Sequence, residues 1–304
     1  MARPSSIALR ADLKHHPPTS PFHLLVLFKR KSKPMNQQPT IGIALSGGGV
    51  RGAAHAGLFK ALEENGIEVT QFSGSSAGAM AGALYAAGYG PEDILEFFKI
   101  SANNIFQWRH FARSKPGILD SDQYAELFEP WLKDHTFESL SKKLHICVTD
   151  VLKGEIRFFS SGELVRPILA SAAVPGVFSP VDIGENWYID GGTMNNFPLE
   201  PLMGQCDVVL GSYVSLKKVL EKNELDSTLQ LLNRASDLSF LALSLQKFKD
   251  CSLVFAPSEL WQYGSFDSKK IDEIYQIGYE HACSKMDSLL AILDRVKADA
   301  RNME

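Results

Sequence analysis

A short apolar strand that runs directly into three consecutive glycines is the feature that most constrains this sequence. Ile41 to Ser46 is apolar almost throughout, and Gly47 to Gly49 follow it without a break. Such a run, without polar alternation, is typical of a strand buried on both faces of a sheet. Residues 51–65 then carry apolar side chains at helical spacing, which predicts a strand, a glycine loop and a helix in immediate succession.

The same unit repeats at once, because residues 67–75 have the pattern of a second strand and residues 76–87 that of a second helix. Strands and helices in alternation predict a parallel sheet with right-handed crossovers, and hence an α/β fold. Further strands are expected at 144–151, 155–160, 207–214 and 251–256, and further helices at 92–99, 122–133, 163–173, 225–248 and 268–298. The leucine stripe of the helix at 225–248 is expected to face the core. These elements predict one domain over residues 40–300.

The charge distribution separates the first 39 residues from the rest. The chain of 304 residues has a net charge of −4, but residues 1–39 contain seven basic residues and one acid. The remaining residues therefore carry −10, without the basic excess that a folded nucleic-acid-binding domain usually shows, so no nucleic-acid partner is expected. No apolar run approaches the roughly 20 residues that a membrane-spanning helix needs.

The arm over residues 1–39 contains six prolines, which exclude a long helix. Its one apolar run, Leu24 to Phe28, is too short for the core of a signal peptide, and the basic cluster follows it. The simplest expectation is a disordered leader. An interfacial membrane anchor and a transit peptide remain alternative hypotheses.

The four cysteines are widely spaced, and none forms a CxxC pair, so neither a zinc site nor a redox motif is expected. Free thiols of this kind are typical of a reducing compartment, which favours a cytoplasmic protein with peripheral membrane contact at most.

The glycine loop, Gly47-Gly48-Gly49-Val50-Arg51-Gly52, lies between a strand and a helix. Backbone N–H groups in such a loop point towards one spot beside a helix N-terminus and bind anions. The anion can be a nucleotide pyrophosphate or the transient oxyanion of acyl transfer. A dinucleotide site would require an acid at the end of the next strand, and residues 71–75 contain none.

A candidate nucleophile lies at the end of the second strand. Gly74-Ser75-Ser76-Ala77-Gly78 is a G-x-S-x-G motif at a strand-to-helix turn, the context in which this motif presents a reactive serine. The alternative is that Ser76 is an ordinary helix N-cap. Because parallel strands end at the same edge of a sheet, we expect Ser76 and the glycine loop to lie side by side.

A serine nucleophile needs a base, and Asp190 is the best candidate. An apolar strand precedes it, and Gly191 and Gly192 allow the chain to turn away from the carboxylate. The alternative is an ordinary Asp-Gly hairpin turn. Among the histidines, His55 is expected to pack or to face solvent, and only His281 follows Asp190 along the chain.

Together these motifs resemble those of the bacterial-type patatin-like phospholipases. The resemblance rests on the glycine loop, the serine motif, Ala170 to Val181 with its Val-Pro-Gly core, and Asp190-Gly191-Gly192, in that order. It implies a three-layer α/β/α fold with a largely parallel central sheet. It covers a motif-bearing part at 41–215, and a C-terminal helical part at 216–300 completes the domain.

The resemblance also implies a function and its residues. Ser76 would be the nucleophile and Asp190 the proton acceptor of a Ser–Asp dyad that cleaves carboxylic esters of lipids or lysophospholipids, with no metal and no cofactor. The oxyanion hole would be formed by Gly47, Gly48 and Gly49, with support from Arg51, Gly52, Gly74, Gly78, Gly191 and Gly192. Membrane contact would involve the N-terminal arm or the aromatic segment 105–111.

Two other functions remain alternative hypotheses. One is an α/β-hydrolase esterase with a Ser–Asp–His triad, in which His281 would have to be the base. The other is a non-catalytic module that binds a nucleotide or another anion through the glycine loop.

Overall fold

The computed structural model describes residues 38–104, 112, 115–217, 219–265 and 267–302. The predicted arm at 1–39 lies outside these residues except for its last two, and the aromatic segment 105–111 lies wholly outside them. All described residues belong to one compact unit, Pro34–Glu304.

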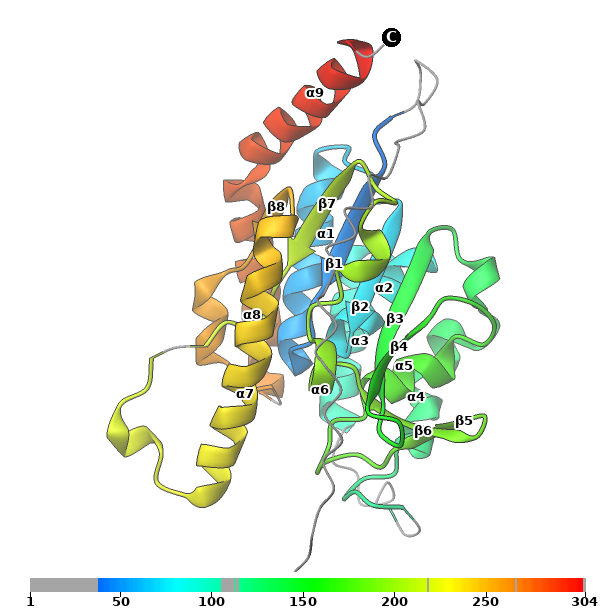
Figure 1. The fold of residues 1–304 in the computed structure, drawn as a ribbon, viewed down its shortest axis with the longest axis vertical. Coiled ribbons are helices and arrows are strands. Elements are labelled where there is room, and N and C mark those ends of the chain that lie inside the picture. Colours follow the sequence, from blue (N-terminus) through cyan, green and yellow to red (C-terminus); the bar gives the residue numbers. More distant parts are fainter. Residues whose placement is uncertain (1–37, 105–111, 113–114, 218, 266, 303–304) are drawn as a thin grey trace, which may run out of the picture. The chain divides into compact units, whose positions relative to one another are not determined.

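The centre of this unit is a sheet of eight strands (Figure 1). Five strands are parallel and follow the order β3-β2-β1-β7-β8. Beyond β3 the sheet continues with antiparallel strands β6 and β5, and β4 also pairs with β3. The strands are β1 (Ile41–Leu45), β2 (Gln71–Ser75), β3 (Lys143–Asp150), β4 (Glu155–Phe159), β5 (Val181–Ile183), β6 (Asn186–Asp190), β7 (Val208–Ser212) and β8 (Leu253–Phe255).

Helices connect the strands and flank the sheet, as the alternating sequence pattern predicts. They are α1 (Ala53–Glu64), α2 (Ala77–Ala86), α3 (Pro91–Asn104), α4 (Ala125–Leu132), α5 (Val165–Ser171), α6 (Gly192–Asn195), α7 (Thr228–Lys247), α8 (Ile271–Ser284) and α9 (Met286–Asn302). A 3-10 turn, Gly49–Gly52, forms the second half of the glycine loop. The predicted α/β class with a largely parallel central sheet is therefore confirmed.

Strand β1 shows why helices are needed on both faces. All five of its residues are buried, as its uninterrupted apolar run predicts. Ile43 and Leu45 belong to a large core that includes residues of α1, α2, α3 and α8. Ala44 points the other way, into a smaller core with Phe197 and, from α7, Leu241. Side chains that alternate between two cores require two helical layers.

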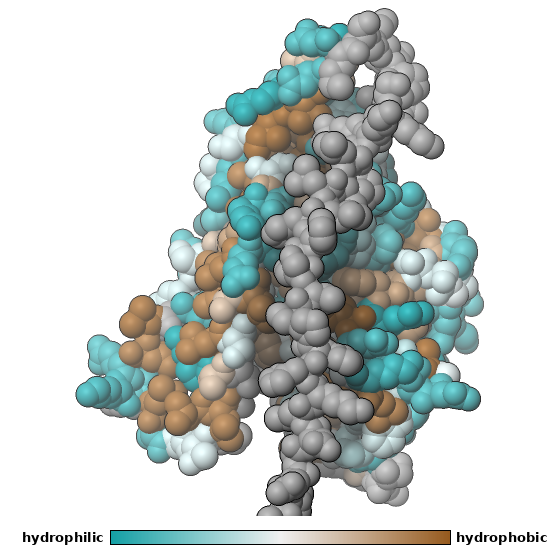
Figure 2. All heavy atoms as spheres, in the orientation of Figure 1, coloured by the Kyte–Doolittle hydropathy of each residue, from teal (hydrophilic) through white to brown (hydrophobic). Residues whose placement is uncertain are grey.

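Two sequence expectations about the C-terminal helices are wrong. The helix expected at 268–298 is two helices, α8 and α9, with a break at Lys285. In the stripe expected to face the core, Leu232, Leu238 and Leu245 are exposed, and only its end, Phe248, packs against the smaller core among the residues described. Within α7, Leu241 also packs against that core. Figure 2 shows hydrophobic side chains gathered over α7 on the surface.

The register of the strands determines which residues lie near Ser76. In the parallel pairs Leu45 is opposite Gly74, and Ser75 is opposite Cys147. In the antiparallel pair Val148 is opposite Asp190. The end of β6 therefore comes to the level of the turn after β2, although 114 positions separate Ser76 and Asp190. Within the described residues, no helix combines the length and the hydropathy of a membrane span.

Candidate active site

Ser76 is held in a strained backbone conformation between β2 and α2. Its φ of 52° and ψ of −122° make it the non-glycine residue with positive φ in the described part of the chain. Such strain persists only where the surroundings enforce it. The Ser76 side chain makes no capping hydrogen bond to α2, although the residue is at the N-cap position. The interpretation of Ser76 as an ordinary N-cap is therefore not supported.

Close packing of the turn explains the flanking glycines. A Cβ atom on Gly78 would lie 2.2 Å from the Leu45 carbonyl oxygen, and one on Gly74 would lie 2.5 Å from the backbone of Gly78. Real Cβ atoms do not tolerate such distances, so α2 can approach β1 only because these positions are glycine. The G-x-S-x-G motif thus follows from the geometry of the turn that presents Ser76.

The turn is also fixed by Ser171, at the end of α5. The Ser76 backbone amide donates a hydrogen bond of 2.8 Å to the Ser171 hydroxyl. That hydroxyl in turn donates to the Cys147 carbonyl oxygen at 2.7 Å. Ser171 belongs to the Ala170–Val181 motif, but the sequence did not indicate this role, because the contact joins residues 95 positions apart.

The structure brings Asp190 to Ser76. The Ser76 hydroxyl lies close enough to the Asp190 carboxylate to lower the pKa of Asp190, and the Gly192 amide donates a hydrogen bond to Asp190 Oδ1 at 2.7 Å. Asp190 is 6% exposed, and this burial raises its pKa to about 6, against the effect of both neighbouring groups. Asp190 is followed by α6, so the hairpin-turn interpretation of Asp190-Gly191 is wrong.

The glycine loop lies beside Ser76, as predicted, but its three amides differ. The Gly47 amide donates to the Asn196 carbonyl oxygen at 3.2 Å, so it is already used. The amides of Gly48 and Gly49 make no hydrogen bond within the described part of the chain. Of the three predicted amides, those of Gly48 and Gly49 therefore have no partner among the described residues, whereas that of Gly47 has one.

The Arg51 side chain contacts the backbone of the glycine loop. Its Nε donates to the Gly48 carbonyl oxygen at 3.1 Å, and its terminal nitrogen reaches the hydroxyls of Ser215 and Ser265 at 3.5 and 3.4 Å. Arg51 is buried, and this burial lowers its pKa. The next residue, Gly52, packs against Phe98 and Ala77. Arg51 thus holds the loop through its side chain, whereas Gly52 allows Phe98 and Ala77 to pack close to the backbone.

Asn196 was missed by the sequence analysis. A Cβ on Gly47 would lie 2.5 Å from Asn196 Oδ1, and one on Gly192 would lie 2.9 Å from the same atom. The carboxamide therefore packs between the glycine loop and the Asp190 turn, and it also lies close enough to the Tyr213 hydroxyl to lower the pKa of Tyr213 against the larger effect of burial. The signal available in the sequence was an asparagine shortly after Asp190-Gly191-Gly192.

Two histidines have roles away from Ser76. His55 is fully buried on α1, where Nε2 donates to the Ser46 carbonyl oxygen at 2.9 Å and Nδ1 accepts from the Ser212 hydroxyl at 2.8 Å. Burial lowers its pKa to about 4, so the ring is neutral and braces the strand before the glycine loop. His281 Nε2 accepts from the Ala256 amide at 3.2 Å. Neither histidine lines the cavity at Ser76.

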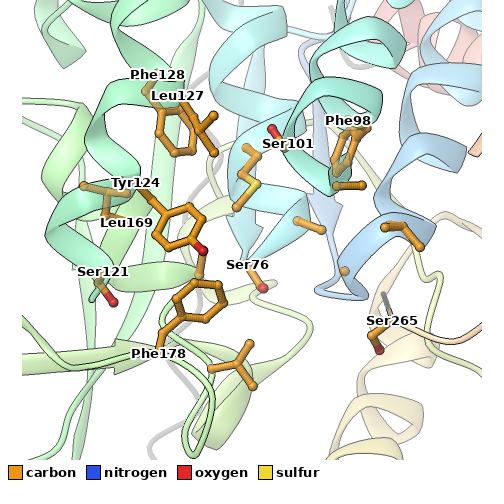
Figure 3. A pocket seen from close by; sticks show the side chains of 17 residues that line it. Ser76, Phe98, Ser101, Ser121, Tyr124, Leu127, Phe128, Leu169, Phe178 and Ser265 are labelled. Atoms are coloured by element: carbon orange, nitrogen blue, oxygen red, sulfur yellow. The ribbon is translucent and has the colours of Figure 1, made fainter. Parts of the chain in front are cut away.

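An apolar cavity opens beside Ser76 (Figure 3). It has a volume of about 100 Å³, and Figure 3 shows Leu127 and Phe128 at the end away from Ser76. Most of the remaining lining is hydrophobic and comes from α2, α3, α5 and the segment around Phe178. In the described part of the chain, no three His, Cys, Asp or Glu side chains are grouped as a metal site would require.

A protein-family model described as patatin-like phospholipase matches residues 43–203 of the chain. The chain belongs to the patatin-like phospholipase family. The matched segment contains every residue of the site described above except Ser212, Tyr213, Ser215, Ala256, Ser265 and His281.

Curated relatives of this patatin-like chain include NTE-family proteins. An uncharacterized NTE family protein of Mycobacterium tuberculosis is 31% identical over 169 residues, which are 56% of this chain and 47% of that protein. Lysophospholipase NTE1 of Coccidioides immitis is 26% identical over 285 residues, covering 82% of this chain and 18% of that protein. The chain thus spans about half the length, or less, of these relatives.

Among solved structures, human GIVD cytosolic phospholipase A2 has a similar fold. The TM-score is 0.52 at 12% sequence identity, and the match covers 86% of this chain and 60% of that chain. At this identity the similarity establishes the shared fold of the patatin-like domain.

Proposed function

We propose that this patatin-like protein is a serine acyl hydrolase that cleaves carboxylic ester bonds of lipids, as a phospholipase A or lysophospholipase does. The observation that carries the proposal is the close approach of the Ser76 hydroxyl to the buried Asp190 carboxylate, beside an apolar cavity. The names of two similar proteins, a lysophospholipase and a cytosolic phospholipase A2, support the same chemistry.

In the proposed reaction Asp190 accepts the proton of the Ser76 hydroxyl as Ser76 Oγ attacks the ester carbonyl. A carboxylate with its pKa raised to about 6 is a better base than an ordinary aspartate and is still ionised at neutral pH. The alcohol part of the lipid then leaves with the proton held by Asp190. Water, activated by Asp190, attacks the acyl-enzyme, releases the fatty acid and restores Ser76.

The negative charge on the carbonyl oxygen would be stabilised by the amides of Gly48 and Gly49. Both lie in the loop beside Ser76 and have no partner among the described residues. Loss of one such donor typically reduces the rate by an amount equivalent to about 3 kcal/mol. The Ser76 turn and the positive end of α2 add to this stabilisation.

The substrate reaches this site from a lipid surface, and we propose that the N-terminal arm or the segment 105–111 provides the peripheral membrane contact. The arm combines a short apolar run with a cluster of basic residues, a composition that suits an anionic surface. Vesicle co-sedimentation of the full chain and of a chain that begins at Met35 tests the arm. Equal binding of both to anionic vesicles would argue against it.

The decisive experiment for the function combines a fluorophosphonate probe with ester hydrolysis. We expect the wild-type protein to be labelled and to hydrolyse p-nitrophenyl butyrate, and Ser76→Ala to lose both activities while it remains folded. Asp190→Asn should lose most of the hydrolysis. Failure of the probe to label Ser76 would favour the anion-binding hypothesis, and full activity of Asp190→Asn with loss in His281→Ala would favour a triad.

A further inference from the structure

A second hollow adjoins the cavity at Ser76. It has a volume of about 320 Å³ and lies between α3 and α4, where it is lined by Tyr89, Ile100, Glu126, Leu127, Pro130 and Trp131. Leu127 is the residue that it shares with the lining of the cavity at Ser76. The two hollows therefore meet at one half-buried leucine side chain.

We propose that this second hollow, here called the distal groove, binds the terminal part of a long acyl chain whose ester carbonyl lies at Ser76, and that Leu127 controls the passage to it. The inference rests on the proposed function and adds the acyl-chain length that the site selects. The other features of the site described above do not determine which acyl-chain length is preferred.

The volumes support an extended acyl site. A cavity of about 100 Å³ is well below the roughly 300–1,000 Å³ that ligand pockets usually have, and it suits a short acyl group. The distal groove adds about 320 Å³, and the combined volume of the two hollows falls within this usual range. A long chain that begins at Ser76 therefore needs space beyond Leu127.

The chemistry of the distal groove suits a hydrocarbon better than a head group. Five of its six lining residues are apolar or aromatic, and Ile100 is 38% exposed. An acyl tail would remove this surface from water, and each methylene so buried improves binding about fourfold.

Trp131, in the wall of the groove, is held by more contacts than an aliphatic side chain such as Leu127 requires for its position. Trp131 packs edge-on against Tyr89 and Phe97, with ring centroids 5.1 and 5.8 Å away, and its carbonyl oxygen accepts a hydrogen bond from the Tyr89 hydroxyl at 2.9 Å. Leu127 is aliphatic and half-buried, so a change of rotamer is enough to alter the passage. A wall held by such contacts, next to one adjustable side chain, is suited to select chain length.

The first test compares hydrolysis of p-nitrophenyl palmitate with that of p-nitrophenyl butyrate. Ile100→Arg places a charge in the distal groove, and we expect it to lower the palmitate-to-butyrate ratio of kcat/KM by about tenfold or more. Leu127→Ala should raise the same ratio. Glu96→Arg is the matched control, because it adds the same side chain to an exposed position of α3 that lines neither hollow. An unchanged ratio in Ile100→Arg overturns the inference.

The second test does not depend on turnover and so separates this inference from the proposed function. In Ser76→Ala, palmitic acid brominated at its terminal carbon should quench Trp131 fluorescence, whereas palmitic acid brominated next to its carboxyl group should not. Trp131→Phe in the same background identifies the signal. Equal quenching by both acids, or none by either, overturns the distal groove even if ester hydrolysis is observed. Selective quenching without any hydrolysis would keep the groove and refute the hydrolase proposal.

Discussion

The backbone amide of Ser76 and the hydroxyl of Ser171 are joined by a hydrogen bond of 2.8 Å. Both groups are buried, and the same hydroxyl donates to the carbonyl oxygen of Cys147 on β3. One side chain thus ties the strained turn after β2 to the neighbouring strand. This connection helps to position the Ser76 hydroxyl relative to Asp190, the last residue of β6, which lies on the other side of β3 from β2.

Substitution of Ser171 should therefore impair hydrolysis by shifting Ser76, and not by removing a contact with the substrate. In Ser171→Ala the Ser76 amide loses its buried partner, which costs about 1–3 kcal/mol of folding free energy. We expect kcat for p-nitrophenyl butyrate to fall about tenfold as the turn relaxes. Ser141→Ala removes a hydroxyl that donates to the Ala86 carbonyl oxygen away from the site, and it should leave kcat unchanged. Equal rates in both variants would show that Ser171 does not position Ser76.

The raised pKa of Asp190 predicts how the rate depends on pH. Burial raises that pKa to about 6, and only the ionised carboxylate can accept the proton of Ser76. We expect kcat/KM for p-nitrophenyl butyrate to be constant above neutrality and to fall about tenfold per pH unit below about 6. A profile that stays flat down to about pH 4.5 would mean that Asp190 is not the base.

The same pKa predicts a gain in stability when the charge is removed. Asp190 binds its proton more tightly in the folded state, since its pKa rises from 3.8 to about 6. Its contribution to the free energy of unfolding is therefore full below about pH 4 and is lost as the pH rises through about 6. At pH 8 Asp190→Asn should be more stable than the wild type by up to about 3 kcal/mol.

Urea unfolding of Asp190→Asn at several pH values measures this effect. The gain should shrink as the pH falls below about 6 and vanish below about 4. Asp294→Asn is the control, because Asp294 is exposed and its substitution should change the stability at no pH. A gain of equal size at all pH values would contradict the assignment of the effect to the Asp190 charge.

Gly78 should be the most sensitive glycine of the serine motif. A methyl group there would lie 2.2 Å from the Leu45 carbonyl oxygen, so α2 would have to move away from β1. We expect Gly78→Ala to lower the free energy of unfolding by about 3 kcal/mol, as overpacking of a tight core does. In Gly264→Ala the new methyl group meets no described atom within 4 Å, and the stability should stay within about 0.5 kcal/mol of the wild type. Urea denaturation of both variants decides the question.

The amino-acid sequence was enough to predict the order of strands and helices, the glycine loop, the turn at Ser76 and Asp190 as the candidate base. These features depend on local properties, such as the burial pattern of β1 and the need for glycine where the backbone packs closely. Local properties leave a visible pattern in a few neighbouring residues. The sequence did not show correctly which leucines of α7 face the core, because apolar residues occupy more than one side of that helix.

Which groups from distant parts of the chain come into contact could be seen only in the folded protein. It joins Ser171 to Ser76, places Asn196 between the glycine loop and Asp190, uses the Gly47 amide internally, and brings the two hollows together at Leu127. Each of these contacts depends on which strands are neighbours in the sheet and on how they are registered. Strand order is set by the packing of the whole chain, so residues far apart in sequence carry no local signal that they will touch.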